Sequence, residues 1–196
     1  MNKVATLIFS CVILWTSNVL AQEAPLGLHW SASAEALKQA GIDLKKSGSD
    51  DFGVGFVAQK VPEGLANQET TLLSFGYDDK LWRIVIVSKS FPNDPAGNAV
   101  RNRYDELVRI LGEKYGKAGV HQVLGESIYS EPRYFLAGIE GGNSVWYSNF
   151  ETSDLFIQIG ILAATSSDAR WRIIYEYKPL KTIFVQEKKG REKGRL

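Results

Sequence analysis

Alternating apolar and polar residues predict several β-strands along this chain. In residues 52–58, Phe52, Val54, Phe56 and Ala58 fall on one side of an extended backbone and glycines fall on the other. A period of two is that of a strand, whose successive side chains point to opposite faces of a sheet. Runs rich in β-forming residues predict the full set of strands, which is 52–58, 70–76, 81–88, 134–140, 144–150, 155–163 and 170–178.

Two segments show the three-to-four residue spacing of amphipathic helices instead. The longer one predicts a helix over residues 98–115, ended by Gly116. Its apolar stripe consists of Val100, Tyr104, Leu107, Val108 and Leu111. A shorter helix is predicted over residues 34–40, because Ser33 can cap its start and Gly41 follows its end.

Short turn segments between the strands indicate the fold class. Residues 77–80, 141–143 and 165–168 are rich in the Asp, Asn, Gly and Ser that tight turns require. Tight turns join antiparallel neighbours, since parallel strands need long crossovers. The predicted order is helix, three strands, helix, four strands. This order is an α+β layout, with one short and one long helix packed on a largely antiparallel sheet. Residues 117–132 are either a meandering loop or a loop with one short irregular strand.

A weak internal repeat accompanies this order. Residues 79–85 and 168–174 both begin with aspartate and contain Trp-Arg-Ile, at Trp82 and at Trp171. The two predicted helices do not precede these segments at the same distance. Duplication of an ancestral unit and convergence of two hairpins therefore both explain the repeat.

The first 21 residues have the layout of a secretory signal peptide. Lys3 supplies a positive start, residues 4–15 are almost wholly apolar, and Val19-Leu20-Ala21 fits the site that signal peptidase cleaves. The apolar stretch is too short for a confident membrane span. We expect a periplasmic or secreted protein cleaved after Ala21, with no stable membrane anchor. A single α+β domain is expected over residues 22–185, and a disordered basic tail over residues 186–196.

The composition of the expected mature chain excludes several kinds of chemistry. The leader contains Cys11, the only cysteine, and Lys3, one of 23 basic residues, so 22 basic and 22 acidic side chains remain. Thiol nucleophiles and zinc–thiolate sites are thereby excluded. The balanced charge leaves no broad basic face, so we expect no nucleic-acid partner.

Residues that carry metal or catalytic chemistry are sparse. The two histidines, His29 and His121, are far apart and neither has another ligand at metal-binding spacing, so no metal site is predicted. Residues 138–142 are glycine-rich but lack the features of a phosphate loop, and no cofactor is expected. One catalytic alternative remains, a cell-wall hydrolase that uses a pair of loop carboxylates. Its candidates are Glu126, Glu131 and Glu140.

Aromatic side chains concentrate in the later predicted strands. Adjacent residues of a strand point to opposite faces, so either Trp146 or Tyr147 faces away from a core that covers one face only. Trp171 and Tyr175 share one side of the last strand, and Arg172 lies on the other. Exposed aromatics beside arginine are common at protein interfaces. The candidate binding residues are therefore Trp146, Tyr147, Trp171, Arg172 and Tyr175. The alternative is that both faces are covered and the aromatics simply favour strands.

One segment resembles a group of small secreted bacterial proteins. Residues 27–37 read Gly-Leu-His-Trp-Ser-Ala-Ser-Ala-Glu-Ala-Leu, and members of that group begin Gly-x-x-Trp-Gly-x-Ser-x-x-Glu-Val. Residues 75–81 and 104–117 resemble the hairpin and the long helix of the same group. Ser31 and Ala36 depart from the pattern. The resemblance implies a small α+β envelope protein with no shared catalytic residues, in which Trp30 determines the fold.

These observations favour a non-enzymatic module that binds a protein partner in the cell envelope, as an accessory or inhibitor-type protein. Its binding surface would be the aromatic face of the sheet or the segment 117–132. Besides the hydrolase, a second alternative is a protein that binds a small apolar ligand between helix and sheet.

Overall fold

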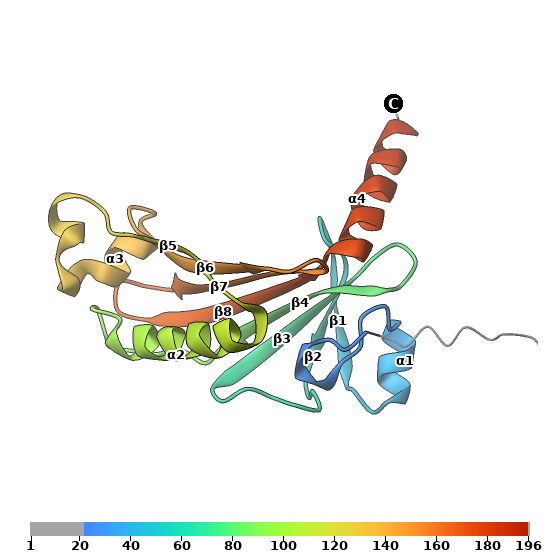
Figure 1. Ribbon diagram of the computed structural model, residues 1–196, viewed down its shortest axis with the longest axis horizontal. Coiled ribbons are helices and arrows are strands. Elements are labelled where there is room, and N and C mark those ends of the chain that lie inside the picture. The colour runs from blue at the N-terminus through green and yellow to red at the C-terminus, as the bar shows by residue number, and fades with distance from the viewer. Residues whose placement is uncertain (1–21, 196) are drawn as a thin grey trace, which may run out of the picture.

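One eight-stranded antiparallel sheet organises the chain (Figure 1). The computed structural model describes residues 22–195, so the predicted signal peptide lies outside the described residues. The order of strands across the sheet is β1-β2-β3-β4-β8-β7-β6-β5. The strands are β1 (Leu44–Asp50), β2 (Gly53–Ala58), β3 (Gln68–Phe75), β4 (Leu81–Ser88), β5 (Gly119–Val123), β6 (Val145–Glu151), β7 (Leu155–Ala163) and β8 (Ala169–Tyr177). The predicted α+β class and the antiparallel pairing are confirmed.

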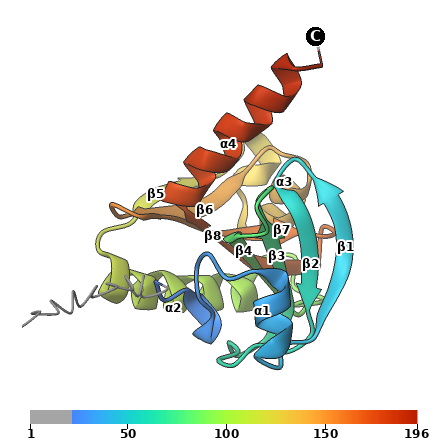
Figure 2. The ribbon, with the colours of Figure 1, turned by 90° about the vertical axis from the view of Figure 1, so that its right-hand side faces the viewer.

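In the part of the chain that the structure describes, four α-helices lie on the two faces and at one end of this sheet. They are α1 (Ala34–Gln39), α2 (Asn98–Tyr115), α3 (Phe135–Glu140) and α4 (Lys178–Lys193). Short 3-10 turns occupy Pro25–Gly27, Ser127–Ser130 and Pro132–Tyr134. Helices α1 and α2 lie on the same side of the sheet, and α4 rises from the other side (Figure 2). The order of elements and the number of helices thus differ from the prediction.

The core lies between the sheet and the helices α1 and α2. The predicted stripe of α2 faces it, with Val100 and Tyr104 fully buried. The hydroxyl of Tyr104 forms a buried hydrogen bond of 2.7 Å with the hydroxyl of Ser148 on β6. Burial raises the pKa of Tyr104, because its ionised form would lose hydration. Trp30 is also fully buried and stacks on Tyr177 at 5.6 Å between ring centres.

The chain forms two halves with the same order of elements. In each half a helix precedes four strands that pair in sequence, α1 with β1–β4 and α2 with β5–β8. The last strands of the two halves pair with each other, and Val85 lies opposite Ile174 at the centre of that ladder. The repeat in the sequence aligns the same two residues, so an approximate two-fold axis passes through them. The inserted segment between β5 and β6, which contains α3, explains part of the unequal helix spacing.

A β-bulge breaks this symmetry at the two repeat tryptophans. The register between β3 and β4 shifts so that Phe75 lies opposite Leu81, which leaves Trp82 as the extra residue. Leu81 enters the core, whereas Trp82 stacks on Phe184 of α4 at 5.2 Å between ring centres. Trp171 lies in the core beneath α2. The bulge therefore directs Trp82 away from the core and toward α4, where it packs against the helix.

Helix α4 is held at one corner of the sheet by an aromatic stack and an ion-pair cluster. Phe184 is buried between Trp82 and Tyr77, whose ring centre lies 5.0 Å away. At the first turn of the helix, Lys181 pairs with the buried Glu176 of β8, which also accepts a hydrogen bond from Arg83 at 3.3 Å. These contacts cover the end of the sheet nearest to α4.

Two of the predictions are wrong, one at residues 135–140 and one at the end of the chain. Residues 135–140 form α3 and not a strand, since a six-residue apolar run fits either structure and the core contacts of Phe135 decide between them. Residues 186–193 form part of α4 and not a disordered tail, because Phe184 anchors the preceding turns.

Two strands lie where the sequence shows little apolar character. Residues 44–50, where neither a helix nor a strand is predicted, form β1, and residues 119–123 form β5 within the segment whose predicted structure was left open. Both are edge strands. An edge strand forms backbone hydrogen bonds with one neighbour only and can remain exposed. Its sequence therefore need not show the alternation of apolar and polar residues that predicts a buried strand.

We expect Phe184→Ala to release α4 without unfolding the sheet. Removing a buried phenylalanine costs about 3–5 kcal/mol, and the loss falls on the helix that the ring anchors. Amide exchange in residues 182–192 should accelerate by about a hundredfold or more, since 1.4 kcal/mol is a factor of ten. Ile183→Ala is the matched control, because Ile183 is 44% exposed. Cooperative unfolding of the whole chain in Phe184→Ala would contradict this account of α4.

Candidate functional site

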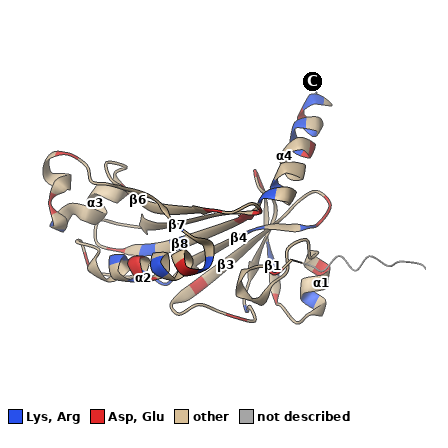
Figure 3. Ribbon diagram, in the orientation of Figure 1, with Lys and Arg blue, Asp and Glu red and all other residues tan. Residues whose placement is uncertain are grey.

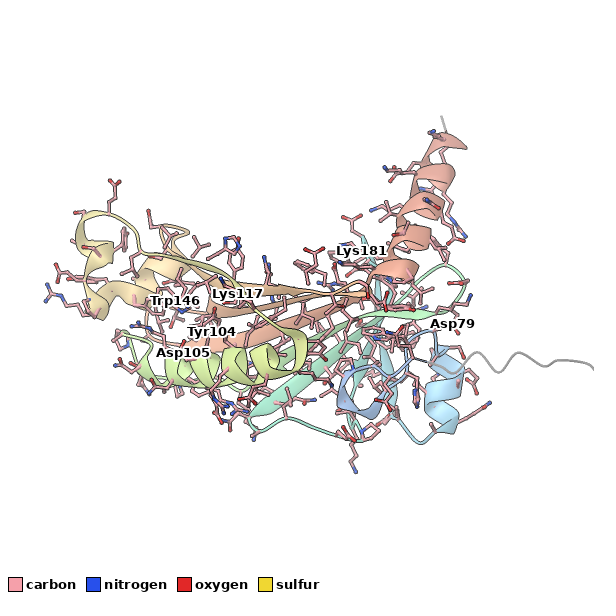
Figure 4. The ribbon with its side chains drawn as sticks, viewed as in Figure 1. Asp79, Tyr104, Asp105, Lys117, Trp146 and Lys181 are labelled. Atoms are coloured by element: carbon pink, nitrogen blue, oxygen red, sulfur yellow. The ribbon has the colours of Figure 1, made fainter. Side chains whose placement is uncertain are left out.

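The sheet face opposite α1 and α2, here called the open face, is uncovered beyond the corner occupied by α4. The two sides are visible in Figure 4, where Tyr104 and Trp146 lie on the α2 side and Lys181 lies on the α4 side. Strand alternation assigns side chains to this face through the register of the ladders. The side chains of interest lie in a row across five strands, namely Val87, Arg172, Gly160, Tyr147 and His121.

This row brings together residues that are distant in the sequence. Arg172 lies opposite Gly160, Gly160 opposite Tyr147, and Tyr147 opposite His121. Strands are spaced ~4.8 Å apart, so about 14 Å separate the backbones of Arg172 and His121. The rings of His121 and Tyr147 stack at 4.6 Å with an interplanar angle of 20°. The row therefore presents a cation next to Val87 and, beyond Gly160, an aromatic pair at its β5 end.

Arg172 has no partner, although its two neighbouring arginines do. Arg83 pairs with Glu176 at 3.3 Å, and Arg170 pairs with Glu69 and donates to the backbone carbonyl of Ser88. No ion pair or side-chain hydrogen bond within residues 22–195 involves Arg172. Its guanidinium is nonetheless partly buried, and that burial lowers the pKa of Arg172. A partly desolvated cation without a counter-charge favours an anion that comes from outside the chain.

A shallow cleft of about 250 Å³ opens beside Arg172. Its walls include Tyr147, Gln158 and Leu162, and Gly160 lies between them. A Cβ atom at position 160 would lie 3.2 Å from the Cβ of Tyr147, so any side chain there would crowd the cleft. The side-chain amide of Gln158 donates to the amide oxygen of Asn149 at 3.1 Å. The cleft is thus lined by an apolar wall, an aromatic ring, an amide and one free cation.

The five predicted binding residues separate onto the two faces. Tyr147 and Arg172 come together on the open face. Trp171 and Tyr175 lie in the core at 0% and 5% exposure, so the prediction that they belong to a binding surface is wrong. Trp146 is half-buried on the α2 side, where its ring meets Phe135 edge to face at 5.2 Å. Trp171 and Tyr175 face the side of the sheet that α2 covers, because burial of these large apolar rings helps to form the core.

Sequence reasoning missed two parts of the site. His121 was considered only as a metal ligand, and Gly160 was not considered. The sequence alone does not indicate that His121 lies beside Tyr147, because that contact depends on the pairing of β5 with β6. Gly160 is the sole glycine of the apolar run 155–163, and a glycine inside a strand can mark a close approach or an opening.

The edge strand β5 borders the open face and lacks the usual protection of an edge. All five of its residues are exposed, and none is Lys, Arg, Asp or Glu. Its ladder with β6 is regular, and within the described residues its backbone forms no hydrogen bond beyond that ladder. The opposite edge, β1, carries Lys45 and Lys46 and a register shift between Lys46 and Gly48. Charges and bulges discourage pairing with another strand, so only β5 presents an edge suited to it.

Apolar side chains surround the free edge of β5. Val123 on β5 lies opposite Val145 on β6, and both are about half exposed, at 57% and 48%. Further exposed apolar side chains in or just after this strand are Val120, Leu124 and Ile128. Val123 and Val145 are direct cross-strand neighbours, and an exposed apolar patch of this kind is typical of an interaction surface.

The candidate carboxylates of the hydrolase alternative do not form a constellation. Glu126, Glu131 and Glu140 are all exposed, and Glu131 pairs with Arg133 at 2.9 Å. Among residues 22–195, no group of three or more His, Cys, Asp or Glu side chains could hold a metal ion. In that same part of the chain, no helix is long and apolar enough to cross a membrane.

Other features of the surface carry less chemical information. A hollow of about 410 Å³ lies between residues 23–29 and the end of α2, and its charged residues, Glu23, Glu63 and Lys114, have both signs. Lysines and arginines gather along α4 (Figure 3), and several of them are engaged within the chain. Lys178, Lys181 and Lys188 form ion pairs, and Arg191 lies over the ring of Tyr77. Neither feature selects a ligand.

The comparisons with known proteins leave the site to be interpreted from its own geometry. No protein-family profile, curated protein sequence or solved structure matches this chain.

We expect Arg172→Met to leave stability unchanged or to raise it by up to about 1 kcal/mol, because a desolvated cation without a partner is removed. Arg83→Met is the matched comparison on the neighbouring strand. It should lower the free energy of unfolding by roughly 2–3 kcal/mol, because the buried Glu176 keeps only Lys181 as a partner. Urea denaturation at neutral pH measures both. A large loss of stability in Arg172→Met would show that Arg172 is structural.

Proposed function

We propose that this protein is a non-enzymatic binding module, secreted or periplasmic, that engages a protein partner through β5 and the adjoining open face. The observation that carries the proposal is the edge strand β5, which is regular, free of Lys, Arg, Asp and Glu, and bordered by exposed valines. An extended segment of a partner can pair with such an edge through main-chain hydrogen bonds. Alternate side chains of that segment would then rest on the open face.

The dimensions of the surface support a protein partner. The row from Val87 on β4 to His121 on β5 crosses four strand spacings, which is about 19 Å. A standard interface buries about 800 Å² on each partner, a patch ~28 Å on a side. The open face with β5 therefore supplies a large part of such a patch. Tyrosine and arginine are the residue types that most often anchor interfaces, and Tyr147 and Arg172 are both present in the row.

The other functions expected as alternatives have less support. The space between α2 and the sheet is filled by core side chains such as Tyr104 and Trp171, both at 0% exposure. A small apolar ligand would have to displace them. The candidate carboxylates are exposed in and around the 3-10 turns and α3, and no pair of them faces a cleft described above.

We expect the double variant Val120→Lys/Val123→Lys to abolish partner capture while leaving the melting temperature almost unchanged. Lysines on an edge strand oppose pairing with another strand, and both valines are 57% exposed, so the fold loses little. The measurement is quantitative recovery of crosslinked partner from an envelope extract by the tagged mature chain.

Ser49→Lys on the opposite edge strand β1 is the control, because it adds a charge to an edge that already carries charge. It should capture as much partner as the unaltered chain. Equal capture by the β5 double variant and by the unaltered chain would refute the proposed function.

A further inference from the structure

We infer that Arg172 and the cleft beside it form a recognition site for one carboxylate of the partner, supplied by an acidic side chain or a chain end. This inference rests on the proposed function and names the chemistry of the partner at that site. It starts from a contrast between three arginines of neighbouring strands on one face. Within residues 22–195, carboxylates of the chain pair with Arg83 and Arg170, and none pairs with Arg172.

The position of Arg172 in the sheet explains why the lack of an ion pair at this residue points to an external anion. Its direct cross-strand neighbours are Val87 on one side and Gly160 on the other, and neither of them carries a charge. A fully exposed arginine without a partner is hydrated and needs none. Arg172 is partly buried, so an incoming carboxylate replaces hydration that folding has already removed.

The chemistry of the cleft selects a planar oxyanion on an apolar stem. The guanidinium offers parallel N–H donors that fit the two oxygens of a carboxylate. Tyr147 and Leu162 can contact the methylene groups of a Glu or Asp side chain, and Gln158 adds an amide. The absence of a side chain at Gly160 leaves the room that this stem needs.

The size of the cleft favours a group on a macromolecule over a free small molecule. Pockets that enclose small-molecule ligands usually measure ~300–1,000 Å³ and bury most of the ligand. This cleft measures about 250 Å³ and is shallow. It can hold one side chain of a partner that is fixed elsewhere, and the nearby edge of β5 supplies that second attachment.

The first arm of the test uses a defined probe. The ¹⁵N-labelled mature chain is titrated with N-acetylglutamate methylamide, which has one side-chain carboxylate, and separately with the neutral N-acetylglutamine methylamide. The acid should shift the Nε–Hε signal of Arg172 and the ring signals of Tyr147, with saturation in the millimolar range, and the amide should not. Arg172→Gln should abolish the shifts, and Arg172→Lys should weaken binding by about tenfold, since lysine keeps the charge but loses the planar fork.

The second arm uses the captured partner. Arg172→Gln should reduce partner recovery by tenfold or more, whereas Arg170→Gln, two residues away on the same face, should reduce it less than twofold. Thermal melting of each variant verifies that it is folded.

The outcomes separate this inference from the function on which it rests. If the acid causes no shift at Arg172 and Arg172→Gln captures normally while the β5 double variant does not, the carboxylate site is refuted and the binding module stands. If the probe binds but Arg172→Gln recovers as much partner as the unaltered chain, the site binds a small carboxylate and not the partner, and the inference is also refuted. Normal capture by the β5 double variant refutes the proposed function itself.

Discussion

The ladder between β4 and β8 is the interaction on which the rest of the structure depends. It joins two four-stranded units into one sheet through five residue pairs, from Arg83 opposite Glu176 to Val87 opposite Arg172. Ile84, Ile86 and Ile173 point from it into the core with at most 1% exposure. Without this pairing, α2 would cover half a sheet, and neither unit would have enough apolar surface to bury around its helix.

The same ladder creates the candidate site on its other face. It places Arg172 between a valine of the first unit and a glycine of the second. Within residues 22–195, the carboxylates of Glu176 and Glu69 pair with Arg83 and Arg170, and neither pairs with Arg172. A partly buried cation without a counter-charge is unfavourable for folding. The presence of such a cation on the central strands of the sheet supports the proposal that Arg172 binds an anion of the partner. The free edge of β5 lies three strands away, so one partner can contact both.

The sequence predicts most of the elements that fill the core and few of those at the margins. The bounds of β4, β7 and α2 follow from their patterns, because each element buries a full face or stripe. Residues 135–140 are too short and too uniformly apolar for the pattern to distinguish helix from strand. Nearly all side chains of β1 and β5 are exposed, so these strands depend on backbone hydrogen bonds to their neighbours. Backbone hydrogen bonds do not require particular side chains, and so the sequence does not predict these strands. Helix α4 depends on a stack between Phe184 and Trp82, and Trp82 reaches that stack because of a bulge far earlier in the chain.

The site shows the same division between local and tertiary information. Alternation alone indicates that Tyr147 and Trp146 point to opposite faces, and that Arg172 points away from Trp171 and Tyr175. Which face the core covers is a property of the whole fold, and so the aromatic residues of β8 were predicted on the wrong side. The meeting of Arg172, Gly160, Tyr147 and His121 in one row depends on the registers of three ladders, which the sequence does not specify.

The most direct test of the account is hydrogen–deuterium exchange of the mature chain with and without its bound partner. The account predicts slower exchange on binding at the backbone amides of Gly119–Val123, which are free on one side of β5, with little change in β1 and in α2. Protection confined to α2, to β1 or to α4, with β5 unchanged, would contradict the claim that the open face and its edge strand are the binding surface.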